Sequence, residues 1–331
     1  MLIEHRTWIQ TGGVIEQDMK QTSTRFRPGD LVEVRSPEEI LQTLDADGTM
    51  NQLPFMPEML AYCGRRFRIA KRALKTCTSG TKHASNMRGF KADDVVILDT
   101  PRCSGSEHDG CQKSCMILWR EAWLRKADGT SQAVRSNGAG EEQLRARLKV
   151  KSGPETYFCQ ASEILNVTDP LPRQKRFTVC LDDIRSGNCS VPSMVRRVSI
   201  WTFWRIRRIF LGPYGRGTCK TTPAETLTLQ AGEKVVVKPM SEIRKTLDGR
   251  SYNRGLWFSP DMRLECGHEK TVQRQLQKII VDGTGEMRKM KNTVYLEGSF
   301  CSCPHVAFGG CPRGEFIYWR EIWLQRRPLS K

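Results

Sequence analysis

The sequence predicts an α+β protein built from two related β-rich modules. Residues 29–64 align without a gap onto residues 232–267 at a constant shift of 203, and 14 of these 36 positions are identical. Each copy is followed by the same hexapeptide pattern, WREAWL at 119–124 and WREIWL at 319–324. Short apolar runs bounded by turn residues are typical of strands. A repeat spaced by about two hundred residues indicates a duplicated domain rather than a solenoid.

The first module is expected over residues 27–126, after a polar leader over 1–26. Pro28-Gly29 opens it, and residues 31–34 predict a strand. Residues 36–39 (SPEE) are typical of a helix start, with proline in the first turn. Further strands are predicted at 66–70, 95–98 and 116–124. This pattern favours a small SH3-like or curled barrel, and the opening phrase resembles SH3-like barrels of the KOW type.

The remaining chain divides into three parts. Residues 127–155 are rich in glycine, serine and charge, so a linker that contains a short helix is expected. Residues 156–225 are predicted to be a basic helical segment, with helices over 157–165 and 195–211. Residues 226–331 are expected to form the second module as a degenerate copy of the first.

Positive charge is concentrated between the two modules. The chain has a formal charge of +17, and eleven lysines and arginines against two aspartates lie between Leu171 and Lys220. A local surplus of this size raises the affinity for polyanions and speeds encounter with them. The segment therefore predicts an anionic partner.

The sequence predicts a folded cytoplasmic protein. Hydrophobic residues make up 38% of the chain and charged residues 27%, which excludes an intrinsically disordered chain. The N-terminal residues MLIEHRTWIQTGG contain no apolar stretch typical of a secretory signal. The sequence contains no run of eighteen apolar residues, so it predicts no transmembrane helix.

The cysteines of the first module predict a zinc site. Thirteen cysteines in a chain without a signal favour metal sites over disulfides. Cys111 and Cys115 have the short spacing of structural zinc ligands, and Cys103 precedes them in a loop too polar to stabilise itself. The predicted ligands are Cys77, Cys103, Cys111 and Cys115, with Cys63 or His108 as substitutes. An iron–sulfur cluster is the alternative cofactor, and buried free thiols are the alternative to any metal.

The second module lacks two of these cysteines. Ile280 stands at the position of Cys77 and Glu315 at that of Cys115, as expected if the two thiols held one ion together. Other donors have entered the loop at 301–311. A second metal site is predicted from Cys266, Cys301, Cys303, His305 and Cys311. The cysteines outside the two modules are expected to be buried and without ligand roles: Cys159, Cys180, Cys189 and Cys219.

The helix predicted over 195–211 combines arginines with aromatic residues. Nucleic acid is the predicted partner, through phosphate contacts and base stacking. An acidic protein is the second candidate, an interfacial membrane helix the last, and a core helix with solvated arginines the structural alternative. The predicted anion-binding residues are Arg196, Arg197, Arg205, Arg207 and Arg208, and the predicted aromatic contacts are Trp201 and Trp204.

Motifs of catalysis are missing from the sequence. It contains no glycine-rich phosphate loop, nucleophile elbow, HExxH pattern or dinucleotide fingerprint. The two tryptophans beside Glu121 could bind a sugar or a base. We favour a closing strand in which they pack and Glu121 pairs with an arginine. A metal-stabilised binding protein is therefore predicted rather than an enzyme.

Two phrases carry a family resemblance, LPFMPEMLAYCGRRFRI at 53–69 and CQKSCMILWREAWL at 111–124. They resemble a family of bacterial proteins of unassigned function that share the two-module plan, and the resemblance spans nearly the whole chain. It implies an accessory role in a pathway for polysaccharides or specialised metabolites, and it supplies no established activity, cofactor or catalytic residue to carry over. The second module departs from the pattern at 263–265 and in the loop at 301–311. The alternative function is an enzyme or enzyme accessory that uses the cysteine-bound metal or the thiols.

Overall fold

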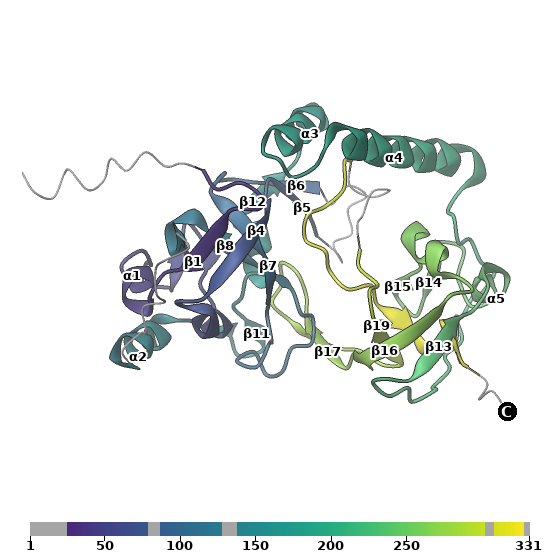
Figure 1. The fold of residues 1–331 in the computed structure, drawn as a ribbon. Helices are drawn as coiled ribbons and strands as arrows, with labels where there is room; N and C mark the ends of the chain where they lie inside the picture. The colour runs from purple at the N-terminus through teal and green to yellow at the C-terminus, as the bar shows by residue number, and fades with distance from the viewer. Residues whose placement is uncertain (1–24, 79–86, 128–137, 302–307, 328–331) are drawn as a thin grey trace, which may run out of the picture.

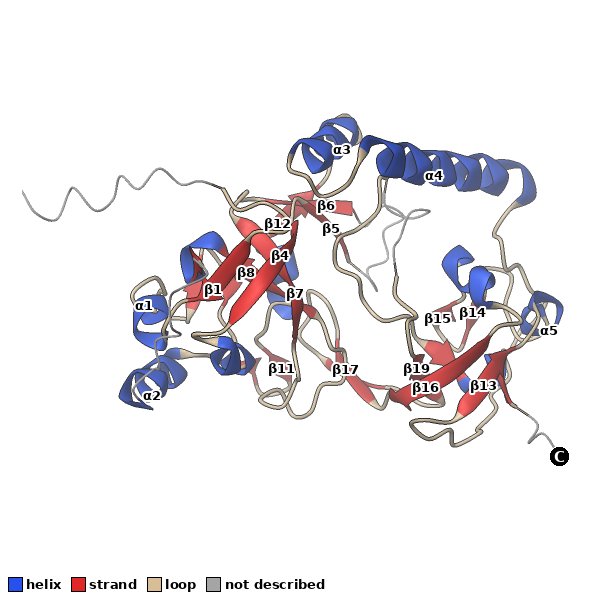
Figure 2. Ribbon diagram, viewed as in Figure 1, coloured by secondary structure: helices blue, strands red, loops and turns tan. Residues whose placement is uncertain are grey.

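The fold contains two five-stranded antiparallel sheets with matching strand orders. The computed structural model describes residues 25–78, 87–127, 138–301 and 308–327. The first sheet has the order β8-β7-β4-β1-β9 and the second β20-β19-β16-β13-β21. Figures 1 and 2 show the two sheets side by side, with β1, β4, β7 and β8 labelled in the first and β13, β16 and β19 in the second. The predicted α+β class with two β-rich modules is confirmed. The predicted leader lies outside the described residues, except for its last two.

The sheets are formed by short strands. The first sheet contains β1 (Leu31–Val34), β4 (Arg66–Arg72), β7 (Val95–Arg102), β8 (Met116–Arg120) and β9 (Leu124–Lys126). The second contains β13 (Lys234–Val237), β16 (Glu269–Gln275), β19 (Thr293–Leu296), β20 (Trp319–Arg320) and β21 (Leu324–Arg326). Smaller antiparallel pairs are β2 (Thr49–Met50) with β3 (Leu53–Pro54), β14 (Tyr252–Asn253) with β15 (Leu256–Trp257), and β17 (Lys278–Ile280) with β18 (Met287–Lys289). The 3-10 helices η1 (Pro57–Tyr62) and η4 (Pro260–Glu265) also correspond, as do α1 (Pro37–Leu41) and α5 (Met240–Arg244).

Each large sheet curls, because two strands adjacent in sequence lie at its opposite edges. Only the 3-10 turn η2 (Glu121–Trp123) separates β8 from β9. The edges of a flat five-stranded sheet would lie about 19 Å apart, whereas four residue steps span at most about 14 Å. The 3-10 turn η5 (Glu321–Trp323) joins β20 to β21 in the same way. The continuous strand expected over 116–124 was therefore wrong, since the chain turns at Glu121.

The paired tryptophans fill the two curled sheets. Trp119 and Trp123 are fully buried, and Phe55 packs edge-on against them with ring centroids 6.3 and 5.2 Å away. Edge-to-face packing of this kind is favourable beyond the area it buries. The second core repeats the arrangement with Trp319, Trp323 and Phe258. The expectation that the tryptophans pack is confirmed.

The glutamate of each hexapeptide anchors a neighbouring segment. Glu121 forms an ion pair with Arg72, as the sequence predicted. Glu321 is 2% exposed and accepts hydrogen bonds from three consecutive backbone N–H groups, at 2.7, 3.2 and 3.2 Å. These N–H groups belong to residues 227–229, which lead into β13. Glu121 likewise accepts a hydrogen bond from the N–H of Phe26 at 3.1 Å. Both carboxylates therefore hold the segment that leads into the first strand of their module, and Glu121 also pairs with Arg72.

Residues 138–170 pack onto the first sheet rather than extending between the modules. The helix α2 (Gly138–Arg147) lies against α1, and its Leu144 is fully buried in the first core. The short strand β10 (Lys151–Gly153) pairs with β11 (Thr156–Tyr157), and β12 (Thr168–Pro170) pairs with β6 (Met87–Phe90), which also pairs with β5 (Lys75–Cys77). The helix expected over 157–165 was wrong in extent, because only the 3-10 helix η3 (Ser162–Leu165) forms there.

Two helices lie along one side of the molecule. α3 (Lys175–Arg185) is followed by α4 (Val191–Leu211), which runs from the side of the first sheet toward the second (Figure 1). α4 begins four residues earlier than expected because the side chain of Ser190 accepts a hydrogen bond from the N–H of Ser193 at the helix start. It ends at Gly212, whose positive φ of 69° glycine adopts without strain. No helix in the described ranges is long and apolar enough to cross a membrane.

Candidate functional site

Four cysteines of the first half line one small cavity, which we call the thiol cavity. It has a volume of about 20 Å³ and is lined by Cys103, Cys111, Cys115 and Cys159. The N–H of Cys103 donates to the carbonyl oxygen of Cys115 at 2.9 Å. Three of the predicted zinc ligands thus lie together, and Cys159, which we expected outside any site, lies with them. Nothing in the sequence signalled that residue 159 would fold back onto this loop.

His108 also lines the thiol cavity, but both of its ring nitrogens are engaged. Nδ1 lies 2.6 Å from a carboxylate oxygen of Glu58, and Nε2 lies 3.0 Å from the carbonyl oxygen of Phe158. Because a carbonyl only accepts, Nε2 carries a proton, and the contact with Glu58 favours a second proton on Nδ1. Burial lowers the pKa of His108, but the hydrogen bond and charge of Glu58 outweigh burial and raise it. His108 therefore stabilises the loop and has no free nitrogen for a metal.

Burial favours the protonated thiol at Cys103, Cys115 and Cys159. Burial raises the pKa of Cys115 to about 12 and that of Cys159 to about 11, and it raises the pKa of Cys103 well above its ordinary value. A divalent cation would favour the thiolate instead. Within the described residues, no three His, Cys, Asp or Glu side chains are arranged as ligands of one ion. The zinc and iron–sulfur assignments therefore stay predictions.

Cys77 lies in a different cluster. It is hydrogen-bonded through sulfur to Cys311, which raises the pKa of the Cys311 thiol together with burial. Cys301 packs in the same apolar cluster, whereas Cys266 packs in the core of the second sheet. Two residues predicted for the second site, Cys303 and His305, lie outside the described residues. The structure thus brings Cys301 and Cys311 together with Cys77 and leaves Cys266 apart.

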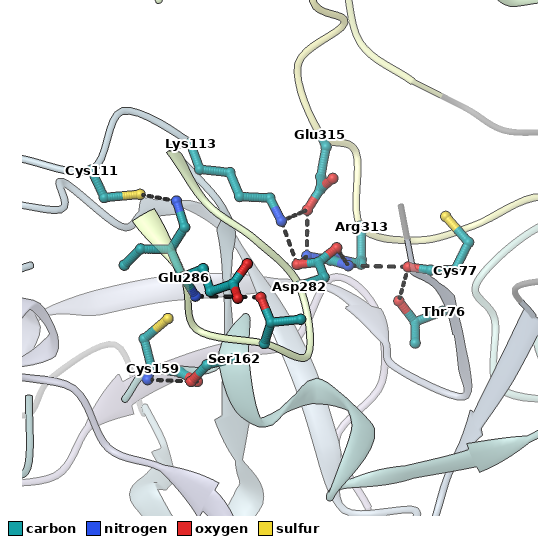
Figure 3. A network of polar contacts seen from close by, with 12 residues as sticks. Thr76, Cys77, Cys111, Lys113, Cys159, Ser162, Asp282, Glu286, Arg313 and Glu315 are labelled. Carbon is teal, nitrogen blue, oxygen red and sulfur yellow. Dashed lines mark hydrogen bonds and ion pairs between the residues drawn. The ribbon is translucent and has the colours of Figure 1, made fainter. Parts of the chain in front are cut away.

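Four charged side chains meet where the two halves join, and we call them the buried charge cluster (Figure 3). Lys113, from the cysteine loop of the first half, forms an ion pair with Asp282, which follows β17. The guanidinium of Arg313 bonds both oxygens of Asp282, at 3.1 and 3.3 Å. Glu315 pairs with Arg313 and lies 3.6 Å from the ammonium of Lys113. The cluster is therefore formed by both halves of the chain.

Burial makes the charges of this cluster interdependent. The Asp282 side chain is 0% exposed and that of Lys113 is 4% exposed. Burial alone would raise the pKa of Asp282, but Arg313 and Lys113 outweigh it and hold that pKa well below its ordinary value. Removing one member of such a set leaves a buried charge without compensation. No sequence pattern signals the cluster, because Lys113 is 169 residues away from its partner Asp282.

The two cysteine positions lost from the second module both contribute to this junction. Glu315, at the position of Cys115, reaches Lys113 of the first half. Ile280, at the position of Cys77, packs in the first core, and its N–H donates to the sulfur of Cys111 at 3.3 Å. Contacts between the halves thus explain both replacements without reference to a metal.

The outer face of α4 carries exposed apolar side chains. Phe203 is 60% exposed, Ile206 51% and Phe210 78%. The predicted aromatic contacts point to the protein instead. Trp201 packs edge-on against Phe308, and Trp204 against Tyr214, each with centroids 5.1 Å apart.

The arginines of α4 divide between the protein and the solvent. Arg207 stacks over Trp204 and Tyr214, and Arg197 lies near Lys71, whose pKa is lowered by burial and then by this charge. Arg196, Arg205 and Arg208 are exposed. Arg173 and Arg205 both lie near Arg176, whose pKa is lowered by burial and then by these two charges. α3 and α4 thus present a group of like charges.

α3 is fixed to the rest of the protein by polar contacts. Lys75, 2% exposed, forms an ion pair with Asp183 of α3 at 2.7 Å and donates to the carbonyl of Phe308 at 3.2 Å. Asn188 exchanges hydrogen bonds with the backbone of Arg72, at 2.7 and 2.9 Å. Both halves of the chain therefore contact the base of the two helices.

No family model, curated protein or solved structure matches this chain. Function is inferred from its own residues.

The buried charge cluster predicts a pH-dependent effect of Asp282→Asn. We expect the substitution to lower the free energy of unfolding by about 3–5 kcal/mol at pH 7, because two buried cations lose a carboxylate. The pKa of Asp282 is depressed in the fold, so its contribution is present above the ordinary value of about 3.9 and is lost as pH falls through the lower folded value. Urea unfolding at several pH values measures the difference between the two proteins, which should shrink below about pH 4.

The matched control is Asp99→Asn, at an exposed position of β7. We expect this control to change stability by less than about 0.5 kcal/mol. Equal losses of unfolding free energy in the two variants would contradict the role of the cluster. A difference between wild type and Asp282→Asn that stays the same below about pH 4 would contradict it too.

Proposed function

We propose that this protein binds single-stranded nucleic acid through the exposed face of α3 and α4. The observation that carries the proposal is a group of exposed arginines without counter-charges. Among the described residues, Arg173, Arg196, Arg205 and Arg208 form no ion pair with a carboxylate.

The acidic residues nearby are already engaged. Of the two aspartates between residues 171 and 220, Asp183 pairs with buried Lys75 and Asp182 lies 3.4 Å from Arg185. Neither neutralises α4, which contains no acidic residue. Like charges held close together repel, and phosphates placed between them relieve that repulsion. A polyanion is therefore the partner that the charge distribution supports.

Exposed rings on α4 favour single-stranded nucleic acid over a uniform anionic surface. Phe203 and Phe210 are seven residues apart, two turns of the helix, and both are more than half exposed. Unpaired bases stack on aromatic side chains, with about 1–3 kcal/mol per base, and this contact tolerates any sequence. Phosphate contacts from the arginines and stacking on the two rings together support single-stranded RNA or DNA.

Affinity for a labelled oligonucleotide tests this proposal. Arg205→Ala together with Arg208→Ala should weaken binding and reduce the slope of log K against log salt by about 1.4, since each phosphate contact on a single strand contributes about 0.7. Phe203→Ala together with Phe210→Ala should weaken binding at an unchanged slope, because stacking releases no counterions. Fluorescence anisotropy at 50–200 mM salt measures both effects.

Arg288→Ala together with Lys289→Ala is the control, because these are exposed cations on β18 of the second half. We expect it to leave affinity unchanged. An equal loss in the control would mean that net charge alone binds the oligonucleotide. Binding to anionic vesicles or to an acidic polypeptide, without binding to the oligonucleotide, would overturn the choice of partner.

Metal analysis tests the predicted zinc separately. The sequence groups Cys103, Cys111 and Cys115 with Cys77, whereas the thiol cavity groups them with Cys159. Their side chains would have to turn toward one ion, because no such ligand set is formed in the described residues. We expect about one equivalent of zinc in the purified protein, retained in Cys77→Ser and lost in Cys159→Ser.

Plasma mass spectrometry of the purified proteins measures the metal content. Loss of zinc in Cys77→Ser alone would restore the ligand set predicted from the sequence. Wild-type protein that contains no metal would contradict the metal site. Iron in place of zinc would favour an iron–sulfur cluster.

A further inference from the structure

The two modules hold one arginine in the same backbone setting but with opposite surroundings. Arg120 ends β8, pairs with Val95 in register, and donates to the carbonyl oxygen of residue 51 at 3.0 Å. Arg320 ends β20, pairs with Thr293, and donates to the carbonyl oxygen of residue 254 at 2.8 Å. The registers make residues 94 and 292 equivalent, 93 and 291 equivalent, and 51 and 254 equivalent.

In the first module, acidic side chains neutralise this position. Arg120 forms an ion pair with Asp94, and Asp93 forms one with Arg25. The third equivalent residue is the neutral Asn51. The charge of Arg120 is therefore neutralised within the module by Asp94.

In the second module, each of the three neighbours is more positive. Asn292 replaces Asp94, Lys291 replaces Asp93 and Arg254 replaces Asn51. Among the residues that the structure describes, Arg320 has no carboxylate within ion-pair distance, and its hydrogen bonds go to two backbone carbonyls and the hydroxyl of Thr293. Burial, and then the charge of Arg254, lower the pKa of Arg320. The second module therefore lacks the carboxylate that pairs with Arg120 in the first, although Arg320 keeps the same type of backbone contact.

A cavity lies at this position. It has a volume of about 60 Å³ and is lined by Arg254, Lys291, Asn292 and Arg320 among others. A single water molecule needs about 10–15 Å³ by the same measure, so the cavity has room for a larger group. The carboxylate that also lines it, Glu225, lies 3.1 Å from the ammonium of Lys238. We call this cavity the basic pocket.

We propose that the basic pocket binds a phosphate group, held by Arg254, Lys291 and Arg320. The fixed arginine supplies a preorganised cation, and the two flanking side chains can close over the oxygens of the ligand. Arg254 and Lys291 are exposed in the structure, so the pocket is accessible from solvent. The pocket lies in the second half, where the end of β14, the residues just before β19 and the end of β20 meet. The proposal does not depend on nucleic-acid binding by α4.

Restoring the residues of the first module tests the proposal with little risk to the fold. Arg254→Asn and Asn292→Asp each introduce the residue that the other module carries at the same backbone position. Both positions have positive φ, 45° and 49°, which asparagine and aspartate tolerate well. We expect each variant to bind inorganic phosphate at least about tenfold more weakly than wild type in isothermal titration calorimetry, since one cation is lost or one anion gained. The melting temperature should stay the same.

Lys289→Ala, on the nearby strand β18, is the control and should bind phosphate like wild type. Wild-type protein that does not bind phosphate at millimolar concentration, or variants that bind it as tightly as wild type, would overturn the proposal. A loss of binding in the control as large as that in the variants would overturn it too.

Two further titrations distinguish free phosphate from the end of a nucleic acid. The first uses an oligonucleotide with a 5′-phosphate and the second the same oligonucleotide with a 5′-hydroxyl. Tighter binding of the phosphorylated form that is lost in Asn292→Asp assigns the pocket to a terminal phosphate. Equal binding of the two forms, with phosphate binding intact, assigns it to the free anion. The 5′-hydroxyl form reports on α4 alone, so failure of one proposal is distinguishable from failure of the other.

Discussion

The structure depends on a carboxylate that is fully removed from water at the junction of its two halves. Asp282 is held between Lys113 of the first half and Arg313 of the second. Taking such charges out of water costs several kcal/mol for each ion, and only a complete set of partners offsets that cost. Backbone hydrogen bonds surround the cluster, among them Gly283 N–H to the carbonyl of Ala161 at 3.0 Å. Charges and backbone together fix the two halves in one relative position.

That junction also determines where α4 lies. The base of α3 and α4 contacts β4 and β5 of the first half through Asn188 and Asp183. Trp201 packs on Phe308, which belongs to the second half. The exposed arginines and rings of α4 keep their positions relative to the two modules only while both supports are in place. The nucleic-acid interface that we propose therefore relies on a charge cluster with which it shares no residue.

The two modules show how one backbone framework can carry different chemistry. The tryptophans of the hexapeptides occupy the same places in both cores. The charged residues around them differ: Arg120 is neutralised by Asp94, whereas Arg320 faces Asn292 and further cations. Packing depends on side-chain shape, so both copies keep it. The Arg120 side chain is buried and keeps its carboxylate partner, whereas Arg254 and Lys291 beside Arg320 are exposed. Exposed charge contributes little to stability, so those two positions can diverge between the copies.

The sequence predicted the features that depend on local pattern. The alternation of β4, the SPEE start of α1 and the aromatic helix α4 are all present. It could not predict contacts that depend on how distant segments return to the sheet. Cys77 was grouped with Cys103 by its position in the same module, but β5 pairs with β6 in a separate small sheet, which places Cys77 beside Cys311. Cys159 was excluded because it lies between the repeats, yet residues 157–167 complete the first core.

The junction should make the two halves unfold as a single cooperative unit. Differential scanning calorimetry of the full chain measures this most directly. The structure predicts one transition whose calorimetric and van't Hoff enthalpies agree. Two resolved transitions, or a calorimetric enthalpy well above the van't Hoff value, would contradict it, because the two halves would then unfold independently.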